Sequence, residues 1–224
     1  MVKKLFPIVA AALLVIGLAV QATAKTITLG SSFEYSGGTA PVSVALPWLT
    51  TAFDDGGGTG SIILTLSATN LIGSEFVSSW YLNVFQESQV TSLSFSAPTK
   101  TGDFADPTIS LETNGFKADG DGKFDILLSS ATSDGVSTRF TAGDSVSYVV
   151  SGIAGLSADS FNVLSSPAGG KGPFTHAEHV QSIGSGNSGW VSGPGVPEPS
   201  SILALLGGVG SLFALRRRAR IVGP

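Results

Sequence analysis

The sequence predicts an all-β protein with one domain folded as a β-sandwich or jelly roll. Apolar and polar residues alternate with a period of two in several short segments, and no stretch between residues 25 and 195 has the spacing of an amphipathic helix. Turn-forming pairs such as Asn114-Gly115 and Gly143-Asp144 separate these segments. Short alternating strands divided by such turns are typical of sandwiches and jelly rolls.

The clearest alternation places Ile62, Leu64 and Leu66 on one face, with Thr65 and Ser67 on the other. The same pattern recurs along the chain and predicts strands at Thr26–Leu29, Val42–Leu46, Ile62–Thr69, Phe76–Phe85, Thr91–Ser96, Thr108–Glu112, Phe124–Ser129, Ser145–Val150 and Ser160–Leu164. We therefore expect the β domain to cover residues 25–181. The following stretch, 182–195, is rich in glycine and serine and is predicted to be a flexible spacer.

The composition of residues 25–195 excludes some classes of site and partner. The chain has no cysteine, so the domain has neither disulfides nor thiolate metal sites and must be stable through its own core. Residues 25–195 carry six basic and 15 acidic side chains, a net charge of −9. This charge argues against nucleic acid and anionic lipid surfaces as partners of the domain.

The first 24 residues have the three parts of a secretory signal peptide. Lys3 and Lys4 precede an apolar run from Leu5 to Val20, and the small-residue site Ala22-Thr23-Ala24 follows. The run is immediately followed by this cleavage site, which favours a removed signal peptide over a permanent N-terminal anchor. We expect cleavage after Ala24 and export of the mature chain.

The last 29 residues form a second targeting segment. It covers residues 196–220, and residues 221–224 follow it as a short tail. An extended Pro-Glu-Pro neck precedes an apolar segment, 200–215, that is predicted to form a short transmembrane helix. At 1.5 Å per residue this segment is roughly 24 Å long, less than the roughly 30 Å hydrocarbon core. The arginines that follow would hold its end on the cytoplasmic side. The residues of the neck and of the basic cluster are Pro197, Glu198, Pro199, Arg216, Arg217, Arg218 and Arg220.

This tail resembles the PEP-CTERM sorting signal, because all three parts match in order and spacing. An ordinary tail anchor is the alternative, but it has no need of Pro-Glu-Pro and usually has about 20 apolar residues. The resemblance implies export through the inner membrane of a Gram-negative bacterium and a transient stay there. It further implies processing at Pro-Glu-Pro by an exosortase, a membrane-embedded transpeptidase, and release to the cell surface or the extracellular matrix. It also implies a link to exopolysaccharide and biofilm, without catalytic residues in this chain.

The segments FDDGGGTG, LTLSATNL, DGDGKFDI and HVQSIG also resemble stretches of short exported proteins that carry this tail. That likeness implies a β-rich domain of undefined activity.

A calcium site is one candidate within the domain. Asp119, Asp121 and Asp125 lie in DGDGKFD, where carboxylates at alternate positions beside glycines can wrap Ca²⁺. The EF-hand pattern fails, however, because Lys123 stands at the third ligand position and Ser130 replaces the bidentate glutamate. A hairpin turn explains the same residues and is favoured.

The histidines and tryptophans supply the remaining candidates. His176 and His179 form H-x-x-H, but positions three apart on a strand point to opposite faces, so we expect surface or edge histidines and not a metal-dependent hydrolase. Trp48 and Trp190 lie in loop-like context and are candidates for stacking on sugar rings, while Trp80 is expected in the core. The sequence thus predicts a structural or interaction protein that is not an enzyme, with a carbohydrate- or calcium-binding module as the alternative.

Overall fold

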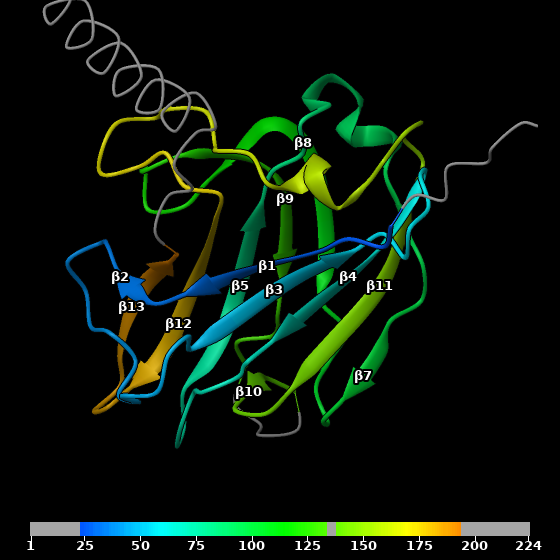
Figure 1. Ribbon diagram of the computed structural model, residues 1–224. Helices are drawn as coiled ribbons and strands as arrows, with labels where there is room; N and C mark the ends of the chain where they lie inside the picture. Colours follow the sequence, from blue (N-terminus) through cyan, green and yellow to red (C-terminus); the bar gives the residue numbers. More distant parts are fainter. Residues whose placement is uncertain (1–22, 134–137, 194–224) are drawn as a thin grey trace, which may run out of the picture.

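Two antiparallel β-sheets pack face to face in the computed structural model, which describes residues 23–133 and 138–193 (Figure 1). This architecture confirms the predicted all-β class. Within the described residues, helical structure is confined to two 3-10 turns, η1 (Glu87–Ser92) and η2 (Ala158–Phe161).

The first sheet, sheet A, has the strand order β1-β3-β4-β11-β6, and β7 also pairs with β11. Neighbouring strands in this sheet run antiparallel, with β3 and β4 joined by a glycine-rich turn. Its strands are β1 (Thr26–Ser31), β3 (Leu49–Asp54), β4 (Ser61–Ser67), β6 (Ser94–Phe95), β7 (Thr99–Thr101) and β11 (Ser145–Ser151).

The second sheet, sheet B, has the order β2-β13-β12-β5-β9-β8, and β10 also pairs with β5. The last two strands of the domain, β12 and β13, form a hairpin that lies between β2 and β5. Its strands are β2 (Phe33–Glu34), β5 (Phe76–Leu82), β8 (Thr108–Lys117), β9 (Lys123–Ser129), β10 (Phe140–Thr141), β12 (His176–Ile183) and β13 (Asn187–Ser192).

The main core lies between the sheets and receives side chains from both. In β4 the predicted alternation is observed, with Leu64 and Leu66 buried. From sheet B, Trp80 and Ile126 enter the same cluster. Full burial of such side chains contributes about 1.5–3 kcal/mol each, which lets the domain fold without disulfides.

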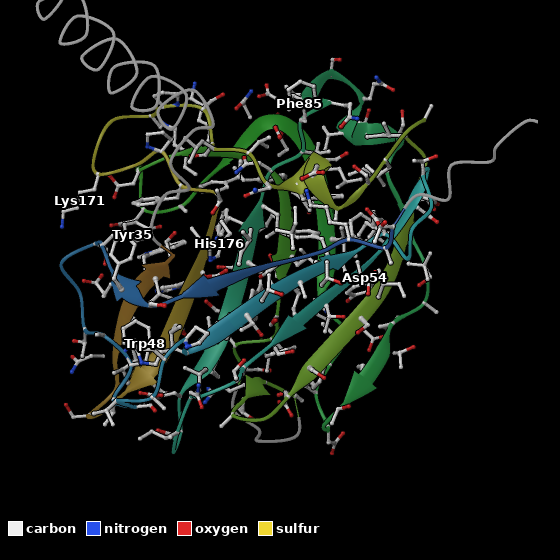
Figure 2. All side chains as sticks on the ribbon, viewed as in Figure 1. Tyr35, Trp48, Asp54, Phe85, Lys171 and His176 are labelled. Atoms are coloured by element: carbon white, nitrogen blue, oxygen red, sulfur yellow. The ribbon has the colours of Figure 1, made fainter. Side chains whose placement is uncertain are left out.

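A smaller core covers part of the outer face of sheet B. It contains Tyr35, Phe124 and Phe174, with their rings close to the tip of the β8–β9 hairpin and the loop that leads into β12. Asp121 in the hairpin accepts a hydrogen bond from the backbone N–H of Lys171 in that loop. Figures 1 and 2 show the hairpin and the loop side by side beyond the strand ends, with Lys171 at the outer margin.

Several predicted strands are confirmed and others are wrong. Strands are observed at the positions expected for β1, β4, β5, β9 and β11, and β8 extends beyond its predicted end. Val42–Leu46 is not a strand: none of the described strands pairs with this segment, and Val44 is 99 % exposed. The predicted strand Ser160–Leu164 begins within η2, and Thr91–Ser96 divides between η1 and β6. Alternation specifies only which residues share a face, whereas a strand also needs a partner.

The predicted spacer is also wrong over residues 182–193, because this part of the chain completes β12 and forms β13. Its glycines have specific structural roles. Gly184 and Gly186 adopt positive φ angles, +56° and +100°, in the turn between the strands. Gly189 lies so close to Thr39 that a Cβ atom would be 2.2 Å from the Thr39 carbonyl oxygen. Glycine here permits a tight turn and close packing.

The two targeting segments lie almost entirely outside the described residues. Ala24, the predicted cleavage position, is exposed and lies two residues before β1 begins. The Pro-Glu-Pro motif, the apolar segment 200–215 and the four arginines lie beyond residue 193. In the described part of the chain, no helix is long and apolar enough to cross a membrane.

Candidate functional site

A buried polar network connects the two sheets near the start of β12. Ser31 ends β1, and its hydroxyl donates a 2.5 Å hydrogen bond to Glu178 Oε2 on β12. The Glu178 side chain points between the sheets because its β5 partner is Trp80, a core residue. His176 Nε2 lies 3.2 Å from Ser31 Oγ, and His176 Nδ1 lies 2.9 Å from Thr175 Oγ1 (Figure 2).

These contacts form one directed chain of hydrogen bonds when the His176 proton is placed on Nε2. His176 then accepts from Thr175 and donates to Ser31. Ser31 in turn donates to Glu178, whose other oxygen, Oε1, has no hydrogen-bond partner within the described structure.

Burial keeps both ionisable groups of this network neutral near pH 7. It raises the pKa of Glu178 to about 8, against the opposing effect of the Ser31 hydrogen bond, and lowers the pKa of His176 to about 4. Glu178 Oε1 and His176 Nε2 are 4.0 Å apart, at the limit of an ion pair. We assign the neutral forms, because both side chains are at most 2 % exposed and charge in the core is costly.

The serine, histidine and glutamate resemble a catalytic triad in composition but not in geometry. Ser31 donates to the glutamate carboxyl group, whereas a nucleophilic serine donates to its histidine. All three side chains are almost fully buried, so a substrate has no direct access to Ser31. The network therefore connects β1 to β12. The predicted surface or edge position is wrong for His176, which is buried.

The two histidines lie on opposite faces of β12, as their three-residue spacing on a strand predicts. His176 faces Ser31 in the interior, while His179 is partly buried on the outer face and stacks on Trp190. They do not converge on a common point, and the described residues contain no group of three or more His, Asp or Glu side chains that could hold a metal.

The three aspartates of the predicted calcium site also serve different parts of the fold. The Asp121 carboxylate accepts the Lys171 N–H. Asp125 accepts backbone N–H groups of Val84 at 3.2 Å and Asn114 at 2.8 Å, while burial raises its pKa. Asp119 is exposed in the hairpin turn with φ = +52°. The predicted turn is confirmed, and two of the three carboxylates hold backbone groups.

The two candidate tryptophans differ in environment. Trp48 is 7 % exposed in the main core, and its indole N–H donates to the Ser43 carbonyl at 2.8 Å, so it offers no ring face to a sugar (Figure 2). Trp190 lies on β13 and is partly buried on the outer face of sheet B. It contacts two rings from neighbouring strands, His179 and Tyr81.

We call Tyr81, His179 and Trp190 the aromatic face. Ring centroids of Trp190 and His179 are 4.5 Å apart with planes at 17°, and those of Trp190 and Tyr81 are 5.4 Å apart at 56°. The sequence predicts sugar stacking only for Trp190 and considers His179 only as a metal ligand. Tyr81 lies 109 positions before Trp190 and joins it only through the order β13-β12-β5. The alternation in β5 was the one available signal for Tyr81, since it placed this residue opposite Trp80.

The last residue that the structure describes lies at the buried network. Gly193 directly follows β13, and a Cβ atom there would be 2.6 Å from the Gly30 carbonyl oxygen and 2.9 Å from His176 Cε1. Pro197 follows four residues later, so an extended chain spans at most ~14 Å between them.

The fold and these sites define a disulfide-free all-β protein of two antiparallel sheets with a partly exposed aromatic face. No family model matches the chain, and no curated protein or solved structure is significantly similar to it.

Proposed function

We propose that this chain is an exported structural or interaction protein of the cell surface or extracellular matrix. The observation that carries this proposal is the ordered tail of Pro-Glu-Pro neck, short apolar segment and arginine cluster, combined with the N-terminal signal peptide. An exosortase would bind the extended neck and replace the tail. The chain is then the substrate of the exosortase reaction and not its catalyst. After processing, the protein takes part in exopolysaccharide and biofilm formation.

The domain has properties that suit this role. Its core forms without cysteine, so its stability does not depend on the redox state outside the cell. Gly193 is packed against Gly30 and His176, and it precedes Pro197 of the processing motif by four positions. His176 and His179 lie on opposite faces of β12, so this pair gives no support to the metal-dependent hydrolase.

The test is mass spectrometry of the mature protein from its native host. We expect a chain that begins at Lys25 and ends near Pro199, with a new group at its C-terminus. Replacing Pro197 and Glu198 with alanine should leave export intact and keep the tail attached. Serine substitutions at Pro194 and Val196, just outside the motif, are the matched control and should be processed normally. An intact chain in the cytosol, or complete processing of the alanine variant, would contradict the proposal.

A further inference from the structure

The aromatic face has the dimensions of a small binding platform. Its three rings come from β5, β12 and β13, which are adjacent in sheet B, so they cover two strand spacings or ~10 Å. The Trp190 ring, on β13, contacts both other rings: it stacks on His179 and is tilted against Tyr81. This width accommodates two linked pyranose rings.

Polar side chains lie beside the His179 ring of this face. Gln181 Nε2 lies 3.3 Å from His179 Nδ1, and Ser78 Oγ lies 3.0 Å from the same nitrogen. Asp119, on the hairpin tip, is exposed and close enough for its charge to oppose the burial effect on the His179 pKa. Within residues 23–133 and 138–193, no hydrogen bond occupies the Asp119 carboxylate. Apolar rings and polar groups therefore occur together on one side of the sheet.

This combination fits a sugar better than other ligands. A pyranose with equatorial hydroxyls has C–H groups on its faces, which pack on aromatic rings, and hydroxyls at its edge, which bond to amides and carboxylates. Nucleic acid bases also stack on aromatic side chains, but they need a basic groove, and residues 25–195 carry a charge of −9. The same charge repels acidic polysaccharides.

We propose that the aromatic face binds neutral polysaccharide with largely equatorial pyranose rings. Trp190 supplies the stacking surface, Tyr81 and His179 extend it, and Asp119 and Gln181 accept or donate hydrogen bonds at the ring edges. This proposal rests on the proposed function, since a cell-surface or matrix protein meets such polymers after export.

The experiment uses the full chain in a zwitterionic detergent, because the headgroup of a maltoside would itself compete. Cellohexaose is titrated while tryptophan fluorescence and calorimetry are recorded. Trp48 and Trp80 are 7 % and 0 % exposed, so a fluorescence change on binding reports Trp190. We expect saturable binding that weakens about tenfold or more in Trp190→Ala and less in Trp190→Phe, which keeps a ring. Phe85→Ala removes an aromatic side chain that is 73 % exposed elsewhere and should bind as the parent does (Figure 2).

Three results would overturn the proposal: no binding by the parent chain up to about 10 mM cellohexaose, a range that covers weak affinities; equal binding by Trp190→Ala; or stronger binding of an acidic oligoguluronate. Trp190-dependent self-association in sedimentation, without cellohexaose binding, would assign the face to a second copy of the chain and also overturn it. Binding does not require tail processing, so the uncut Pro197→Ala, Glu198→Ala chain should still bind. Failure of the binding proposal can therefore be distinguished from failure of the sorting proposal.

Discussion

Glu178 is a fully buried carboxyl group, and its protonation depends on the fold around it. The hydroxyl of Ser31 satisfies one oxygen, while the other faces His176 at 4.0 Å without a hydrogen bond. Tyr35 is also buried, and its pKa is raised by burial and by the Glu178 charge, so it stays neutral over the range in which Glu178 titrates. The pH dependence of the network is therefore set mainly by Glu178 and His176.

We predict that stability falls between pH 6.5 and 8. The pKa of Glu178 is raised from 4.5 to about 8, so folding loses stability as the pH rises through this range. The pKa of His176 is lowered from 6.5 to about 4, which gives an opposite slope below pH 6.5. The two effects offset each other between about pH 4.5 and 6.5. Above pH 6.5 Glu178 acts alone and costs about 2 kcal/mol.

Urea unfolding of the parent chain at pH 6.5 and pH 8.5 measures this loss. Glu178→Gln cannot ionise and should show a smaller change in unfolding free energy between the two pH values. Glu112→Gln, at an exposed position on β8, is the control and should keep the parent slope. An unchanged slope in Glu178→Gln would show that Glu178 does not titrate in this range.

At the scale of elements, the β12–β13 hairpin shows how glycine content misleads a sequence-based assignment. Gly184 and Gly186 form its turn, and Gly189 allows the segment around Thr39 to approach β13. The Thr39 backbone N–H also donates to the Ser188 carbonyl at 3.0 Å. Composition alone favours flexibility here, but the tertiary contacts explain each glycine.

We predict that Gly189→Ala destabilises the domain by about 1–3 kcal/mol or more, because the new methyl group would meet backbone atoms that cannot rotate away. The measurement is the midpoint of urea unfolding. Gly58→Ala is the matched control: its Cβ would meet only the Asp55 carbonyl oxygen at an ordinary 3.6 Å. If the two variants are equally stable, the close packing of β13 against Thr39 is not a constraint.

At the scale of the whole molecule, the folded domain and the proposed sorting signal are separated by very little chain. The expected spacer of residues 182–195 is largely taken up by sheet B, and Gly193 packs against Gly30 and His176. Only residues 194–196 remain before Pro197. If the tail enters the membrane as proposed, the domain stays close to the membrane until the neck is cut.

We therefore predict that the length of chain between Gly193 and Pro197 limits processing. Deleting residues 194–196 brings Pro197 next to the packed Gly193, so the amount of processed protein in the native host should fall several-fold. Inserting Gly-Ser-Gly after Gly195 should leave processing unchanged, which mass spectrometry and immunoblotting of the C-terminus would show. Normal processing of the deletion variant would mean that the enzyme reaches the motif without free chain or that β13 opens.

The alternation of apolar and polar residues was sufficient to predict a strand and its buried residues where the strand contributes one face to the core. Ile62, Leu64 and Leu66 were correctly placed because their alternation directly reflects burial. Val42–Leu46 shows the same alternation but lies in an exposed loop, and Leu49–Asp54 forms a strand although no strand was predicted there. Pairing with other segments decides such cases. The candidate site was predictable only in part, because Trp190 was named as a loop residue without its neighbours Tyr81 and His179.

The sequence by itself determined the all-β class, the absence of disulfides and the acidic charge, and it predicts the two targeting segments. Each of these follows from composition or from patterns within a few residues. Only the tertiary structure decided that Ser31 meets Glu178 across 147 positions, that Trp48 is buried and that Trp190 contacts Tyr81. The physical reason is register: alternation states which residues share a face, but strand order and pairing determine which distant residues touch.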